Sequence, residues 1–485
     1  MDSNKKVTSG FLWIYLENTS AQIVSFLVTI VLARLLEPTH YGTIALLTVF
    51  IALAQIFVTS GISSALIQKK DADELDYSTM FWFNLTVSLV LYFILFICAP
   101  SISNYYNRPE LVLVLRVLAI SIPLSAFNCI QQAYVSSHFI FKKSFISNSG
   151  GVIISGFVGI LMAYLGYGLW ALVAQRLVHV ALNTVFLKLV ISWYPKIMFS
   201  FERLKPMMAF GWRMMATGFL FTGYSQLRSL VIGKRYSAED LGYYDRGFSF
   251  PNLIASNIDS SITRVLFPAL SKYQDDADNL SVKSRRAAKL SAYIMTPLLW
   301  GLAIISKPLV ALLLGDKWLP CVPYMQIMCI VWWLQPTQTC SAQAIKAIGR
   351  SDLYLKIELL SKAVGLILLA VAVFLFDSVI AIAFMYLAGQ FAAVLIYGVY
   401  SEKYIGYKLK DQFVDLMVPA AMAFIACSVA YLLSYTQIGT INICIILQLF
   451  CVSGIYLCLS ILFHNETSNC LLYTSDAADD RISVD

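Results

Sequence analysis

Basic side chains inside apolar stretches are the residues of this sequence best suited to chemistry. Nine lysine and arginine residues lie in such stretches, where a charged side chain is costly to bury. Arg176 and Lys362 lie about eight to ten residues inside theirs, roughly 12 to 15 Å along a helix, from which a side chain reaches the headgroups with difficulty. Cations at this depth would offset the cost of moving an anionic group through a region of low dielectric. The two residues are therefore candidates for binding an anionic cargo.

An ion pair inside the membrane is the competing explanation for these charges. Glu17, Asp259 and Glu358 also lie in apolar stretches. Glu358 precedes Lys362 by four residues, which places the two side chains on the same helical face, one turn apart. Lys362 is therefore explained equally well by an ion pair and by a contact with cargo. Arg176 has no acidic residue in its own stretch.

Four other basic residues have a simpler explanation. Arg34, Arg116, Arg246 and Arg264 lie within about one turn of the ends of their stretches, where long side chains can extend to the headgroups. A structural role is therefore favoured for each of them over contact with cargo. Arg246 and Arg264 are still included among the candidate residues below.

Polar residues at helical spacing indicate which faces of four stretches point inward. Such stripes more often pack helices together than bind a ligand, but their presence at equivalent places in both halves of the chain fits a hydrated central cleft. Arg228 lies beside one of them. The stripes are Asn18, Gln22, Ser25 and Thr29; Thr48, Gln55, Thr59 and Ser63; Thr222, Ser225 and Ser229; and Ser249, Asn252, Ser256, Asp259 and Thr263. The residues predicted to line the cleft and contact cargo are Arg176, Arg228, Lys362, Arg246, Arg264, Asp259, Glu17, Asn252, Gln22 and Gln55.

The stretches that position these residues predict an all-α integral membrane protein. The 485 residues are 59% hydrophobic and 13% charged, with a mean hydropathy of +0.72, outside the range of soluble globular proteins. A helix needs about 20 apolar residues to cross a bilayer, and the first stretch shows no cleavage site, so it is expected to be an uncleaved span. Fourteen spans are expected, at 11–36, 41–67, 79–100, 112–138, 148–165, 168–192, 207–233, 242–268, 287–314, 320–347, 352–376, 378–400, 412–434 and 441–463.

Catalytic and metal sites find no support in the sequence. The ten cysteines lie almost entirely in apolar stretches without a CxxC pair, and His40, His138, His179 and His464 are scattered. We therefore expect no catalytic residue, no metal site and no cofactor, and H⁺ or Na⁺ stays open as a coupling ion.

The loops predict the orientation of the chain in the membrane. Alternate loops starting from the N-terminus hold twenty-one lysine and arginine residues, and the other loops hold four. Because basic residues stay on the cytoplasmic side, the N-terminus is expected to be cytoplasmic. The net charge of +7 is then a topology signal and does not indicate a nucleic-acid partner. The outer loops, of about eleven residues at most, have no room for an extramembrane catalytic domain.

A repeated corner predicts two related halves. "ARLLEPTHYG" at 33–42 and "GKRYSAEDLG" at 233–242 both lie between apolar stretches, at an offset of 200 residues. We interpret them as parts of two six-helix bundles related by a pseudo-two-fold axis along the membrane normal, followed by two extra C-terminal helices. The predicted parts are a bundle at 1–192, a cytoplasmic linker at 193–206, a bundle at 207–400, two added helices at 401–469 and a tail at 470–485 that looks like translated adapter sequence and is not expected to be native.

Several stretches resemble a known family. "VLARLLEPTHYGTIALLTVFIALAQIFVTSGISSALIQKKD", "SLVIGKRYSAEDLGYYDRG", "RVLFPALSKYQ" and "LLLGDKWLPCVPYMQIM" closely resemble the polysaccharide transporter (Wzx-type flippase) branch of the superfamily that also holds multidrug and toxic compound exporters. The resemblance implies a fold of two six-helix bundles and a cargo of undecaprenyl-pyrophosphate-linked oligosaccharide. It also implies a place in the bacterial inner membrane, with membrane lipids and polysaccharide assembly machinery as partners.

Two other functions stay open at this point. A multidrug exporter of the same fold would carry cationic amphiphiles and should favour acidic residues, but intramembrane bases outnumber Glu17, Asp245, Asp259 and Glu358 by nine to four. A membrane oligosaccharide polymerase would need a sizeable outer loop with catalytic side chains. Both observations favour transport of an anionic cargo.

Overall fold

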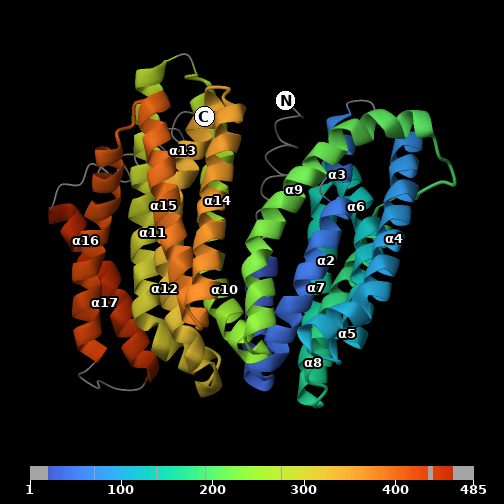
Figure 1. The fold of residues 1–485 in the computed structure, drawn as a ribbon, viewed down its shortest axis with the longest axis horizontal. Coiled ribbons are helices and arrows are strands. Elements are labelled where there is room, and N and C mark those ends of the chain that lie inside the picture. The colour runs from blue at the N-terminus through green and yellow to red at the C-terminus, as the bar shows by residue number, and fades with distance from the viewer. Residues whose placement is uncertain are drawn as a thin grey trace, which may run out of the picture. The chain divides into compact units, whose positions relative to one another are not determined.

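The computed structural model describes residues 20–59, 61–69, 72–137, 140–191, 193–274, 276–434 and 441–462, and these residues form helices joined by short loops (Figure 1). No strand occurs among them. The chain divides into two compact units, Met1–Gly242 and Tyr243–Asp485. The prediction of an all-α membrane protein is confirmed.

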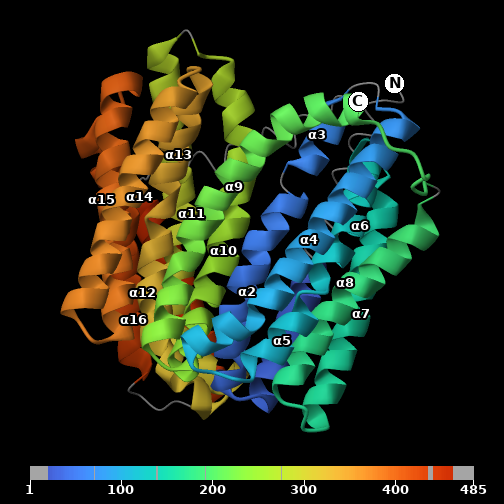
Figure 2. The ribbon, with the colours of Figure 1, turned by 45° about the vertical axis from the view of Figure 1, so that its right-hand side comes forward.

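The first unit holds the N-terminal helices. A short apolar helix, Ser20–Leu35, comes before α2, and α7 and α8 pack side by side along their length, as Figure 2 also shows. α2 packs against α6, α8 and α9, so it is central to the candidate site described below. The helices are α2 (Pro38–Thr59), α3 (Ile62–Gln68), α4 (Glu74–Tyr106), α5 (Leu111–Leu118), α6 (Ser121–Ser137), α7 (Phe141–Tyr164), α8 (Leu169–Val190) and α9 (Phe201–Arg235).

The second unit is built around α11. This helix packs against α12, α13, α16 and α17, and α14 packs against α15. The elements are α10 (Ala238–Ser271), whose first turn belongs to the first unit, α11 (Ala277–Leu313), the 3₁₀ helix η1 (Asp316–Cys321), α12 (Val322–Trp333), α13 (Gln335–Ala347), α14 (Ser351–Leu375), α15 (Val379–Ile405), α16 (Leu409–Ser434) and α17 (Ile441–Leu462).

Ten of the described helical segments are long and apolar enough to cross a membrane. Of the other predicted spans, 207–233 and 242–268 correspond to α9 and α10, whose polar and charged residues lower their hydropathy. The span predicted at 320–347 is interrupted between α12 and α13, and much of the first span lies outside the described residues. The remaining ten predicted spans each overlap one of the ten segments.

Two helices begin earlier than the apolar pattern predicts, because polar side chains cap them. The Ser200 hydroxyl accepts a hydrogen bond from the Arg203 N–H at the start of α9, and the Asp276 carboxylate accepts one from the Asn279 N–H at the start of α11. α9 therefore starts inside the segment predicted as the linker 193–206. The division of the structure falls after Gly242, later than the predicted boundary, and the predicted bundles stay a prediction.

The two copies of the repeated corner pack against each other within the first unit. A Cβ atom on Gly42 would lie 1.7 Å from the carbonyl oxygen of Ala238, and one on Gly242 would lie 2.2 Å from that of Pro38. Only glycine leaves room for this approach of two backbones. The corner thus has glycine at both copies because each copy is the other's packing surface.

Candidate functional site

Arg176 lies at the contact of α8 with α2. Its side chain is half-buried, and Nη1 donates a hydrogen bond of 2.9 Å to Oγ1 of Thr48. Among the described residues no carboxylate pairs with it. An arginine in this position keeps most of its five N–H donors for another acceptor, and none of the described acidic residues neutralises its charge.

Further polar groups line the same helices. Gln55, two turns along α2 from Thr48, donates from Nε2 to Oγ of Ser125 on α6 at 3.4 Å. His179 lies three residues after Arg176 on α8, and its Nε2 is buried with no hydrogen-bond partner in the described part of the chain. The only signal for His179 was its spacing from Arg176, which puts both side chains on neighbouring parts of one helix face.

Arg228 is the most buried of the candidate arginines. Only 8% of its surface is exposed, and the guanidinium carbon lies 5.6 Å from the ring centroid of Tyr224, one turn earlier on α9. The aromatic face stabilises a cation placed over it. Arg176 and Arg228 are therefore two positive charges held in the first unit by a hydroxyl group and an aromatic ring.

Lys362 is different, because its charge has an acidic partner. Its Nζ lies 3.5 Å from Oε2 of Glu358, and Oε1 of Glu358 accepts a hydrogen bond of 2.6 Å from the Tyr397 hydroxyl. The ion pair weighed in the sequence analysis is thus present in the structure. Its presence favours a structural role for Lys362, and a contact between Lys362 and cargo stays a prediction.

Asp259 is an acidic candidate residue in the second unit that, like Arg176, is held by a hydroxyl group. Its Oδ1 accepts a short hydrogen bond from the Thr339 hydroxyl of α13, and Gln335 donates to the same hydroxyl at 3.3 Å. No basic side chain in the described residues pairs with Asp259. Asn252 is half-buried two turns earlier on α10.

The other candidates are spread over the molecule. Nη2 of Arg246 lies 3.7 Å from the carboxylate of Asp245, its neighbour in sequence. Arg264 and Gln22 are exposed, and Glu17 lies outside the described residues. Of the ten candidates, the first unit thus positions Arg176, Gln55 and Arg228 on α8, α2 and α9, which pack together at α2.

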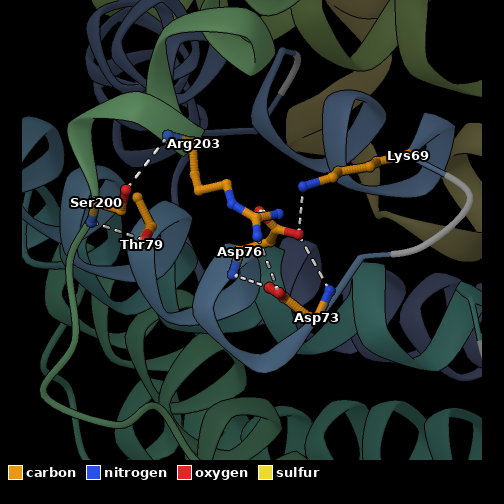
Figure 3. Close-up of polar contacts among 6 residues, drawn as sticks. All are labelled: Lys69, Asp73, Asp76, Thr79, Ser200 and Arg203. Atoms are coloured by element: carbon orange, nitrogen blue, oxygen red, sulfur yellow. Dashed lines mark hydrogen bonds and ion pairs between the residues drawn. The ribbon is translucent and has the colours of Figure 1, made fainter.

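The sequence analysis missed a polar cluster at the start of α4. Asp76 is fully buried, and its carboxylate lies 2.5 Å from Nζ of Lys69 and 3.6 Å from Nη1 of Arg203 (Figure 3). Asp73 caps α4, and the Asp76 N–H that donates to it holds the pKa of the Asp73 carboxyl below its usual value. The only sequence feature that pointed to this cluster was the acidic run at 71–76, and that run does not reveal that Arg203 would pair with it.

The solved structures that resemble this chain are membrane transporters. The chain is 16% identical to the lipid II flippase MurJ in an inward closed conformation, with a TM-score of 0.74 over 94% of this chain and 99% of that one. It is 16% identical to a multidrug resistance MATE family transporter of the MOP superfamily in an inward-facing conformation, with a TM-score of 0.61 over 80% of this chain and 95% of that one. The fold is therefore that of these multi-pass helical membrane transporters.

Within that class the family is also clear. Residues 31–323 match the family described as polysaccharide biosynthesis protein, and the chain belongs to it. It is 27% identical to the teichuronic acid biosynthesis protein TuaB of Bacillus subtilis, over 72% of this chain and 73% of that protein. It is 24% identical to the lipopolysaccharide biosynthesis protein WzxC of Escherichia coli, over 73% of each, and 25% identical to the succinoglycan biosynthesis transport protein ExoT of Rhizobium meliloti, over 67% of this chain and 66% of that protein.

Proposed function

We propose that the protein moves undecaprenyl-pyrophosphate-linked oligosaccharide from the inner to the outer leaflet of the bacterial inner membrane, for O-antigen, capsule or exopolysaccharide assembly. Three findings support the proposal: the polysaccharide biosynthesis family, a relative named as a succinoglycan transport protein, and a fold shared with a lipid II flippase. In this proposal the chain works by alternating access and has no catalytic residue. H⁺ or Na⁺ drives the cycle, and assembly enzymes receive the cargo.

The observation that carries the proposal is that no acidic side chain in the described part of the chain pairs with Arg176. A pyrophosphate is costly to bring into a region of low dielectric unless cations and N–H donors replace its water. The hydrogen bond from Nη1 to Thr48 fixes one edge of the guanidinium and leaves the remaining N–H groups for phosphate oxygens. Arg228, held over Tyr224, supplies a second cation in the same unit.

Replacing Arg176 tests this role directly. We expect Arg176→Ala to insert into the membrane normally but to reduce the flipping rate by a factor of about 100 or more, since a charge-assisted contact to phosphate is lost in a dry environment. Arg176→Lys should be milder, because the charge stays but the forked donor geometry is lost. The measurement is the accessibility of lipid-linked oligosaccharide in the outer leaflet of proteoliposomes over time.

Arg116 provides the matched control. Its guanidinium lies 4.1 Å from the ring centroid of Phe96 and its Nε donates to the Phe96 carbonyl oxygen, so its contacts are structural. Arg116→Ala should keep its flipping rate per folded molecule within about twofold of the unsubstituted protein. Normal flipping by Arg176→Ala would show that Arg176 does not bind the cargo.

A further inference from the structure

The segment between α8 and α9 has two different faces. On one side Trp193 is buried and stacks on Tyr134 at a centroid distance of 6.1 Å, with Tyr77 at 5.7 Å. On the other side Ile197 is 93% exposed and Phe201 is 77% exposed. Tyr194 and Phe199 are also exposed. A row of exposed apolar side chains on a segment whose other face is anchored needs a partner.

Hydrogen bonds to α4 fix the position of this segment along the helix. The N–H of Lys196 donates to the Ser78 hydroxyl and the N–H of Ser200 donates to the Thr79 hydroxyl, both at 3.2 Å. Nε1 of Trp82 donates to the carbonyl oxygen of Lys196 at 2.8 Å. Figure 3 shows the Ser200–Thr79 contact beside the buried Asp76 cluster.

The position of these contacts along α4 places the segment at the edge of the membrane. α4 is long and apolar enough to span a bilayer, and it begins at Glu74. Ser78 and Trp82 lie four and eight residues further on, which is about 6 and 12 Å along a helix that rises 1.5 Å per residue. The linker therefore runs beside the first turns of a spanning helix, at the depth where headgroups meet acyl chains.

The basic residues around the exposed side chains differ in whether they have a partner. Nζ of Lys196 lies 2.6 Å from Glu74, and Arg203 lies 3.5 Å from Asp73. Lys188 and Lys205 are exposed, and no acidic side chain in the described residues pairs with either.

These two lysines lie next to the apolar side chains. The carbonyl oxygen of Lys188 accepts a hydrogen bond from the Tyr194 hydroxyl at 3.1 Å. Lys205 lies four residues after Phe201 on α9, on the same helical face. Apolar side chains flanked by unpaired lysines are the combination that binds an anionic membrane surface.

We infer that the face formed by Lys188, Tyr194, Ile197, Phe199, Phe201 and Lys205, here named the linker face, is a docking surface for anionic phospholipid. Ile197 and Phe201 insert between the headgroups, and Lys188 and Lys205 bind their phosphates. The hydrogen bonds to Ser78, Thr79 and Trp82 keep the backbone in place while the side chains face the lipid. The inference concerns the bilayer and does not depend on the identity of the cargo.

The first test measures where the linker face lies. Ile197→Cys is labelled with an environment-sensitive fluorophore in proteoliposomes, and the signal of the labelled native cysteines in the unsubstituted protein is subtracted. Brominated phospholipid should quench the label at 197 strongly, and iodide in the buffer should quench it weakly. Asp276→Cys, at an exposed cap outside the helices, should show the opposite pattern. A label at 197 that iodide quenches, or that neither quencher reaches because protein covers it, would overturn the inference.

The second test measures the charge preference. Native mass spectrometry compares how much phosphatidylglycerol and phosphatidylcholine the full chain retains. Each lysine close to an anionic surface contributes about 1 kcal/mol, a factor of about five in affinity, so Lys188→Gln/Lys205→Gln should lose most of the preference for phosphatidylglycerol. Lys272→Gln/Lys356→Gln removes the same charge from two other exposed, unpaired lysines and should change the preference by less than twofold. Equal losses in the two double variants would contradict a specific role for the linker face.

Discussion

Arg176 and Lys362 look alike in the sequence, but the structure gives their charges different partners. Both are basic residues deep inside an apolar helix. Lys362 lies 3.5 Å from Glu358, so its unit supplies the opposite charge. Arg176 has a hydroxyl group, that of Thr48, and no carboxylate among the residues that the structure describes. The two charges of an ion pair neutralise each other, whereas a cation held by a neutral hydroxyl group can still attract an anion.

Giving Arg176 the kind of partner that Lys362 has tests whether its free charge matters. Thr48→Asp places a carboxylate where the hydroxyl now accepts from Nη1 at 2.9 Å. The new ion pair should keep the protein folded but occupy the guanidinium, so we expect flipping to fall by a factor of about 100, as in Arg176→Ala. The flipping rate in proteoliposomes is the measurement, and Thr48→Asn, which is similar in size and neutral, is the control. Thr48→Asp flipping as fast as Thr48→Asn would mean that the free charge of Arg176 is irrelevant.

A smaller change at Thr48 tests whether its hydroxyl positions Arg176. Thr48→Val removes the hydroxyl but leaves the shape and the charge of Arg176 unchanged. One hydrogen bond to a charged group is worth about 1.5 kcal/mol or more, so the concentration of cargo that gives half the maximal rate should rise by about tenfold. Thr48→Ser keeps the hydroxyl and should restore the original value. If Val and Ser behave alike, the hydrogen bond does not position Arg176.

Spacing explains which of these contacts the sequence could predict. Glu358 and Lys362 are four residues apart on one helix, so their pairing follows from the helical repeat alone. Thr48 and Arg176 are 128 residues apart, and their contact depends on how α2 packs against α8. The polar stripe that contains Thr48 and Gln55 predicted that this face of α2 points inward, but it could not name the arginine that would contact it.

The same limit applies to the cluster around Asp76. The helical class and most of the spans follow from apolar stretches, because the membrane requires them. The approach of Arg203 to Asp76 does not, since it joins the start of α9 to the start of α4. The early start of α9 was visible in principle, as Ser200 is a good helix-capping residue, but the apolar pattern alone placed the start six residues later.

Substitution of Lys362 is expected to have the smallest effect on transport. Lys362→Met should leave the flipping rate per folded molecule within about twofold, because the charge of Lys362 is already neutralised. It should still lower the stability of the folded protein by about 1 to 2 kcal/mol, since the half-buried Glu358 loses its cation and keeps only the hydroxyl of Tyr397. Thermal unfolding in nanodiscs measures this loss.

A second variant distinguishes the loss of the ion pair from the loss of a contact with cargo. Glu358→Gln/Lys362→Met removes both charges, so it should recover much of the stability lost in Lys362→Met while flipping stays unchanged. A loss of flipping in both variants, at normal stability, would show that Lys362 acts on the cargo despite its partner. Lys362 would then have to be counted among the residues that act on the cargo, and the pairing with Glu358 would no longer distinguish a structural cation from a functional one.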